Sequence, residues 1–126
     1  MLVVEGDVDH LLVITPLLER WGLRVDAAAD VEEAAELLRD EDDYALVLLD
    51  TGMPGEEAYA RIEAVRGLDA ARRLPVLAMA AAPLPEPGQH GLADADVLVK
   101  PIDPGALRDA IARRLGGDGL ADLGRA

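Results

Sequence analysis

The sequence contains no cysteine and no serine, and these absences exclude several kinds of chemistry. Without thiols or serine hydroxyls, cysteine and serine nucleophiles are excluded. Two histidines, His10 and His90, cannot build a Cys/His zinc site without cysteine, and both are expected to face solvent. No disulfide framework is available to indicate secretion. From composition alone, we expect any bound metal ion to have oxygen ligands.

Long apolar runs and a targeting segment are also lacking. The longest apolar runs are far shorter than the ~18 residues that a membrane-spanning helix needs. Residues 1–5 lead directly into acidic residues without the basic region of a signal peptide. We therefore expect no membrane partner and a cytoplasmic location.

Basic residues are scarce, with 12 against 25 acidic residues, and the formal net charge is -13. Such a field repels the phosphates of nucleic acids and of anionic lipids, so neither is an expected partner. Lys100 is the only lysine, since every other basic residue is arginine. A sequence that otherwise avoids lysine makes Lys100 a candidate functional residue.

The 126 residues are 51% hydrophobic, which is typical of one globular domain. We expect this domain at residues 1–116, followed by a flexible tail or linker at 117–126. Short apolar runs predict strands at 1–4, 23–27, 44–49, 75–80 and 96–99. Residues spaced three or four apart predict helices at 9–21, 31–39, 56–66 and 104–115.

This alternation indicates an α/β fold, a doubly wound five-stranded parallel sheet with helices on both faces. The stretch Pro83–Gly88 carries proline at every second position, which excludes a regular helix there. At most a turn or two of helix fits at 89–93. The fourth helix of such a fold, which lies between the fourth and fifth strands, should therefore be short or missing. In the helix at 9–21, Pro16 predicts a bend or a later start.

Charged residues follow three of the predicted strands. Glu5 and Asp7 follow the first strand, Asp50 the third and Lys100 the fifth. Parallel strands end at the same edge of their sheet, which is where such folds bind ligands. Carboxylates gathered at this edge repel one another unless they hold a divalent cation or contact a basic partner such as Lys100.

Four segments carry a resemblance to a known family: Leu2–Glu5, Leu46–Pro54, Pro75–Met79 and Leu98–Pro101. In order and spacing they resemble the receiver domain of two-component response regulators, over about residues 1–115. The resemblance implies a flavodoxin-like strand order 2-1-3-4-5 and a phospho-accepting signalling domain rather than an enzyme. The stretch at 17–22 is similar to receivers attached to hybrid histidine kinases.

The resemblance also implies roles for individual residues. Asp50 would be the phospho-acceptor, and Lys100 would pair with its carboxylate and then with a phosphoryl oxygen. Glu5, Asp50 and the backbone carbonyl of Gly52 would hold Mg2+. Pro101 matches a structural proline that often follows a cis bond in the family.

Three positions depart from the family pattern. Gly6 replaces the second acidic residue, and Asp7, one position later, is an uncertain substitute because the offset changes its face. Mg2+ should therefore bind more weakly than in the family. Ala80 replaces a hydroxyl residue and Val97 an aromatic switch residue, so both switch positions are lost. We expect conformational switching to be weakened.

Two functions remain open. In the first, Asp50 accepts a phosphoryl group from a histidine kinase or a phosphotransfer protein, as part of a phosphorelay. In the second, the chain is a pseudo-receiver that binds protein partners without phosphorylation. A homodimer is compatible with either. Asp50-Thr51-Gly52 also resembles an aspartic protease half-site, but helix signals after every strand disfavour that fold.

Overall fold

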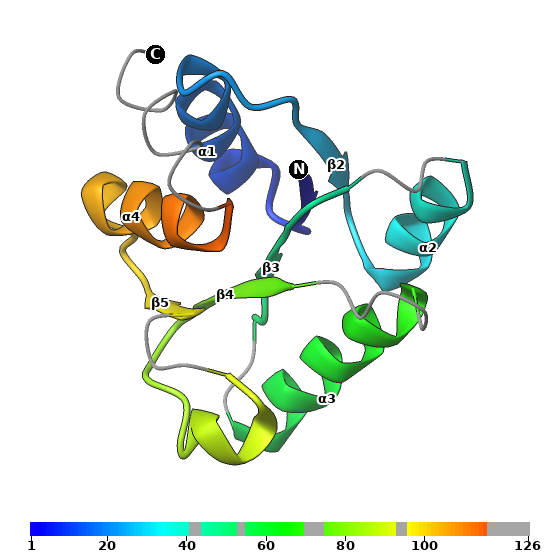
Figure 1. Cartoon of the computed structure of the whole chain (residues 1–126), viewed down its shortest axis with the longest axis vertical. Coiled ribbons are helices and arrows are strands. Elements are labelled where there is room, and N and C mark those ends of the chain that lie inside the picture. The colour runs from blue at the N-terminus through cyan, green and yellow to red at the C-terminus, as the bar shows by residue number, and fades with distance from the viewer. Residues whose placement is uncertain (41–43, 53–54, 70–74, 93–95, 116–126) are drawn as a thin grey trace.

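The computed structural model describes residues 1–40, 44–52, 55–69, 75–92 and 96–115, which form one layered α/β unit (Figure 1). The expected tail at 117–126 lies outside the described residues, as do Met53 and Pro54 of the motif after Asp50. The strands are β1 (Leu2–Val4), β2 (Asp26–Ala28), β3 (Val47–Asp50), β4 (Val76–Ala80) and β5 (Val97–Val99). The α-helices are α1 (Val8–Arg20), α2 (Val31–Asp40), α3 (Gly55–Arg66) and α4 (Pro104–Leu115).

The five strands form one parallel sheet in the order β2-β1-β3-β4-β5, which confirms the predicted architecture. Helices α1 and α4 lie on one face of the sheet, and α2 and α3 lie on the other (Figure 1). Because every crossover in such a sheet returns to the same edge, all strand ends that precede a helix gather there.

Burial alternates along the strands and divides the core into two clusters. Leu2 and Val4 of β1 pack with α2 and α3, whereas Val3 packs with α1 and α4. Leu48 and Leu49 of β3 divide between the clusters in the same way, and every residue of β3 and β4 is buried. This two-sided burial is the physical reason for the uninterrupted apolar runs in the sequence.

Two predicted strands differ from those observed by more than one residue at an end. The second was expected at 23–27, but β2 is Asp26–Ala28, and Leu23 and Val25 instead pack into the cluster beneath α1 and α4. The third was expected at 44–49, but β3 begins at Val47 and includes Asp50 as its last residue. Apolar periodicity reports burial, and these segments are buried beyond the residues that pair in the sheet.

The proline-rich segment between β4 and β5 contains a short 3₁₀ helix, η2 (Pro87–His90). A helix at this place was expected to be short or missing. Helix η2 begins two residues earlier than predicted, because a proline is tolerated at the first position of a helix. Arg66, at the end of α3, donates from Nη2 to the Gly91 carbonyl at 3.1 Å and so holds the end of η2. Helix α1 begins at Val8, so Pro16 lies within it rather than marking a later start.

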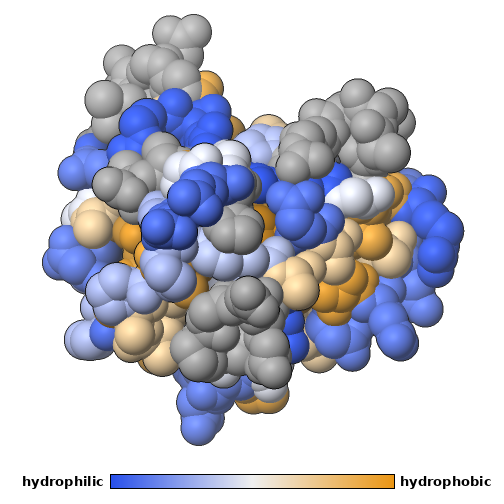
Figure 2. All heavy atoms as spheres, turned by 90° about the horizontal axis from the view of Figure 1, so that it is seen from below, coloured by the Kyte–Doolittle hydropathy of each residue, from blue (hydrophilic) through white to orange (hydrophobic). Residues whose placement is uncertain are grey.

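The outer surface is mixed in character. On the face seen from below in Figure 1, hydrophilic side chains cover most of the periphery and hydrophobic ones appear as separate patches (Figure 2). Among the described residues, no helix is both long and apolar enough to cross a membrane.

A buried ion pair joins the start of β5 to α4. Asp96 is 1% exposed and accepts a hydrogen bond from Arg114 Nε at 2.9 Å and a second from Arg114 Nη2. Arg113 Nη2 is more distant, at 3.8 Å, on a side chain that is about half exposed. Asp96 directly precedes the strand that carries Lys100, so this pair helps to fix the position of β5.

We expect Arg114→Ala to lower the free energy of unfolding by about 2–3 kcal/mol, because a buried carboxylate loses its two-pronged partner. The matched variant Arg113→Ala removes a longer and more exposed contact and should cost under about 1 kcal/mol. Urea denaturation of both variants measures the difference. Equal losses would show that Arg114 has no special role.

Candidate functional site

Three charged side chains meet at the carboxyl edge of the sheet. Glu5 follows β1 directly, Asp50 ends β3, and Lys100 follows β5. The sheet fixes them there, since the Glu5 amide donates to the Ala28 carbonyl at 2.8 Å and the Lys100 amide donates to the Ala80 carbonyl at 2.8 Å. Glu5 is 3% exposed and Asp50 8%. The structure thus brings together three of the four charged residues that the sequence placed after these strands.

Asp50 is held at both carboxylate oxygens. Lys100 Nζ donates to Oδ2 at 2.7 Å, and the Gly52 amide donates to Oδ1 at 2.9 Å. Burial acts to raise the pKa of Asp50, but the hydrogen bonds with Glu5, Lys100 and the Gly52 amide outweigh it, so this pKa lies below its ordinary value. Asp50 is therefore an anion at neutral pH.

Glu5 has the opposite tendency. Burial, followed by the hydrogen bond that it shares with Asp50, raises the pKa of Glu5, while its contacts with His10 and the Asp7 amide act against this rise. When the two carboxylates share one proton, the proton stays on Glu5 and the charge on Asp50. The negative charge of the pair is therefore kept on Asp50.

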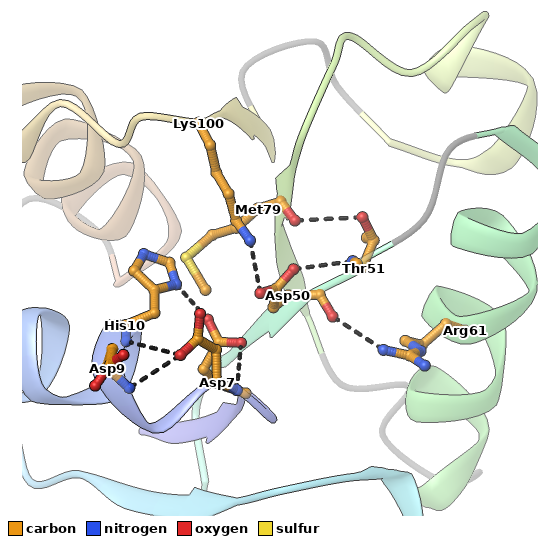
Figure 3. A network of polar contacts seen from close by, with 10 residues as sticks. Asp7, Asp9, His10, Asp50, Thr51, Arg61, Met79 and Lys100 are labelled. Atoms are coloured by element: carbon orange, nitrogen blue, oxygen red, sulfur yellow. Dashed lines mark hydrogen bonds and ion pairs between the residues drawn. The ribbon is translucent and has the colours of Figure 1, made fainter.

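Helix α1 brings His10 into this cluster, which differs from the expected solvent-facing position. Its Nδ1 contacts Glu5 Oε1, and its side chain is 20% exposed. Figure 3 shows His10, Asp50 and Lys100 converging from α1, β3 and the end of β5. The sequence did contain a signal for this position of His10. His10 lies in the first turn of a helix that directly follows an acidic strand end, and such a turn lies over the same edge of the sheet.

Asp7 lies at the start of α1, next to Glu5. It is the N-cap of α1, and its Oδ1 accepts from the Asp9 amide at 3.0 Å and the His10 amide at 3.5 Å. Its own amide donates to Glu5 Oε2 at 3.2 Å. Asp7 thus caps the helix (Figure 3) and supports Glu5 through its backbone amide, and its role as a substitute for the acid missing at Gly6 stays a prediction.

The turn after Asp50 has supports that the sequence did not reveal. Arg61 Nη1 donates to the Asp50 carbonyl at 3.3 Å, and the buried Thr51 hydroxyl donates to the Met79 carbonyl at 3.3 Å (Figure 3). Gly52 has φ +65°, a conformation that side chains disfavour, which explains glycine there. These contacts fix the direction of the Asp50 carboxylate.

The remaining predicted positions surround this centre. The Lys100–Pro101 bond is cis. Ala80 ends β4 with 1% exposure and offers no hydroxyl, and Val97 is partly buried in β5 against the cluster beneath α2 and α3. Val97 also borders a hollow of about 230 Å3 with Val99, Leu84 and two prolines.

The donors present fit a divalent cation. One oxygen of Glu5, one oxygen of Asp50 and a ring nitrogen of His10 all lie within 4.8 Å of one another. Two carboxylates so close together repel each other unless a proton or a cation lies between them. The site can thus hold a cation beside the carboxylate that Lys100 orients.

Comparisons with known proteins agree with this geometry. A family model described as response regulator receiver domain matches residues 1–112. The transcriptional regulatory protein ZraR of Escherichia coli is 32% identical over 91% of this chain, and the chain spans only 26% of that protein. A 14.6 kDa protein of Leptolyngbya boryana is 35% identical, with 82% of this chain and 80% of that protein covered.

Among solved structures, the chain is similar to the receiver domain of the sensor histidine kinase PA1611 from Pseudomonas aeruginosa. The identity is 28% and the TM-score 0.72, with 91% of this chain and 95% of that chain covered. The family match, the strand order and the acidic strand-end site agree, and the chain belongs to the response regulator receiver domains of two-component systems.

Proposed function

We propose that Asp50 accepts a phosphoryl group from a phosphohistidine in a kinase or phosphotransfer protein. The observation that carries this is the Asp50 carboxylate itself, which is anionic, oriented by Lys100 and the Gly52 amide, and 8% exposed. A carboxylate oxygen of Asp50 bonds to phosphorus, while the bond from phosphorus to the imidazole nitrogen breaks and its electron pair leaves with the imidazole. The product is an acyl phosphate on Asp50.

The other residues assist this transfer by position and charge. Lys100 Nζ lies 2.7 Å from Oδ2 of Asp50. It is placed to attract a negatively charged oxygen of the phosphoryl group as this group is transferred to Asp50. The PA1611 receiver holds a magnesium ion in its active site cleft. In this chain Glu5, Asp50 and the Gly52 carbonyl would hold Mg2+, which would neutralise charge on the phosphoryl group.

The surface beside the site suits a protein donor. Val8, Leu12 and Val13 of α1 are each about two-thirds exposed. A pocket of about 460 Å3 lies between α1 and the segment that begins at Lys100. We assign this face to the partner that carries the phosphohistidine, because a donor that docks on it lies next to Asp50.

The departures at Gly6, Ala80 and Val97 support a second candidate, a pseudo-receiver that binds partners without phosphorylation. Ala80 cannot donate a hydrogen bond to a phosphoryl group, and Val97 is too small and too stiff to act as a rotamer switch. Under the first candidate, the losses at Gly6 and Ala80 slow the labelling of Asp50, and the loss at Val97 weakens the response to it. The two candidates therefore differ in one measurable property, whether Asp50 is labelled.

Further attributes of the proposed function concern the surroundings of the domain. We assign it to the cytoplasm, where its kinase or phosphotransfer partner would act. A hybrid histidine kinase is one protein that could contain it. ZraR is a transcriptional regulatory protein, so the expected lack of a nucleic-acid partner applies to these 126 residues and not to a longer protein.

Incubation with acetyl phosphate and Mg2+ should add one phosphoryl group to the wild type, and intact-mass analysis detects it. Asp50→Asn should remain unlabelled, because an amide is a poor nucleophile and carries no charge. Labelling should be slow and should require metal. A folded wild type that stays unlabelled under every condition would instead identify a pseudo-receiver.

Asp7→Ala tests whether the neighbouring acid is a cap or a metal ligand. As a cap, its loss should cost about 1 kcal/mol of unfolding free energy and leave the metal-dependent labelling of Asp50 intact. Thermal denaturation and the mass assay measure the two effects. Loss of labelling in a folded variant would make Asp7 part of the site.

Lys100→Met should slow the labelling of Asp50 by about a hundredfold, because the transfer loses a positioned positive charge. Lys100→Arg keeps the charge but not the compact ammonium group, so its labelling rate should lie between those of the wild type and Lys100→Met. Time courses of the phosphoryl adduct, taken at one metal concentration, give these rates. An unchanged rate in Lys100→Met would remove Lys100 from the mechanism.

A further inference from the structure

The acidic site contains a nitrogen ligand in a position where composition alone predicted only oxygen. His10 comes from α1, Glu5 from the end of β1 and Asp50 from the end of β3, so three elements bring one donor each. Their ligand atoms lie within 4.8 Å of one another. Glu5 and Asp50 are buried and His10 is largely covered, so the cluster is not an accidental group of surface side chains.

The capping of α1 fixes the imidazole in this position. Asp7 accepts from the His10 amide, so the first turn of the helix is held over the strand end. Nδ1 then lies against Glu5 Oε1. The imidazole and the Glu5 carboxylate therefore face each other in a direct hydrogen-bond contact, and a cation bound by both would replace the hydrogen of this contact and move the two side chains apart.

The donor set differs from the one that Mg2+ favours. Mg2+ takes oxygen ligands in near-ideal octahedral geometry, whereas imidazole suits Zn2+ and other first-row transition cations. Gly6 removes one carboxylate, and His10 adds one imidazole. Because the chain has no thiols, His10 is the softest donor that this cluster contains.

We propose that the site selects a transition dication of the Zn2+ class over Mg2+, with His10 Nδ1 as a ligand beside Glu5 and Asp50. The inference deepens the proposed function, because it concerns the cation of the same site. His10 thus replaces in part the acid that is missing at Gly6, and the cation preference changes with it.

The first experiment compares metal affinities by isothermal titration calorimetry on tag-free protein without a phosphodonor. Most protein sites bind transition cations tightly whatever their design, so the informative quantity is the ratio of Zn2+ to Mg2+ affinity in each variant. His10→Asn should lower the Zn2+ affinity by at least ~10-fold, since even an outer partner of a metal site contributes that much. Its Mg2+ affinity should change far less.

His90→Asn is the matched control, because His90 is the only other histidine in the sequence. It should leave the ratio unchanged, and the ring nitrogen signals of His10 should shift on adding Zn2+ to either the wild type or this control. An equal ratio in wild type and His10→Asn would overturn the proposal. The proposal would also be overturned if the loss of Zn2+ affinity occurred in His90→Asn. It would likewise be overturned if Zn2+ left the contact between His10 and Glu5 undisturbed.

The reciprocal variant Gly6→Asp restores the missing carboxylate. A Cβ at Gly6 would meet its nearest neighbour, the Ala29 carbonyl oxygen, at 3.4 Å. The backbone at Gly6 is not in the left-handed region, so an aspartate can adopt its conformation. This variant should bind Mg2+ more tightly and show a lower Zn2+ to Mg2+ ratio. A Mg2+ affinity no higher than that of the wild type, in a folded protein, would contradict the role assigned to position 6.

The outcomes separate this proposal from the proposed function. Labelling of Asp50 with an unchanged metal ratio in His10→Asn would refute the cation preference and leave the phosphoryl acceptor intact. A lowered ratio together with an unlabelled Asp50 would establish the metal site and refute phosphoryl transfer.

Discussion

The two-sided burial of the parallel sheet is the constraint on which this structure depends. Helices cover both faces, and every residue of β3 and β4 is buried. A charged side chain can then reach solvent or a ligand only where a strand ends. Glu5, Asp50 and Lys100 occupy such ends, so the packing that stabilises the core also concentrates the reactive groups at one edge.

That concentration creates a repulsion, and the site distributes it unequally. Lys100 and the Gly52 amide stabilise the charge on Asp50, while burial favours the protonated form of Glu5. Two carboxylates in one cluster thus acquire different tendencies from their neighbours rather than from their own chemistry. Asp50 remains an anion, and Glu5 can bind a proton or contact His10.

The alternation of short apolar runs with helical patterns predicted a parallel sheet and charged residues at its strand ends, and the resemblance to the receiver family predicted the strand order. The sequence misplaced β2, since buried residues such as Val25 look the same whether or not they pair in the sheet. It also missed His10 and Arg61, whose roles depend on how far each helix is rotated and advanced over the sheet edge. Periodicity identifies the inward face of a helix, but the direction of a polar side chain in its first turn depends on the cap, here Asp7.

The departures from the family pattern divide the domain into two parts. The acceptor site draws on β1, β3, α1 and the end of β5, where Asp50 and Lys100 remain paired. Ala80 and Val97, at the predicted switch positions, lie in β4 and β5, and Val97 borders the segment that contains the short helix η2. Under the proposed function, phosphoryl transfer uses the first part, whereas a change of shape at a distance needs both. We therefore propose that the chain would accept a phosphoryl group, or hold a cation, with little rearrangement of the α3–η2–β5 side.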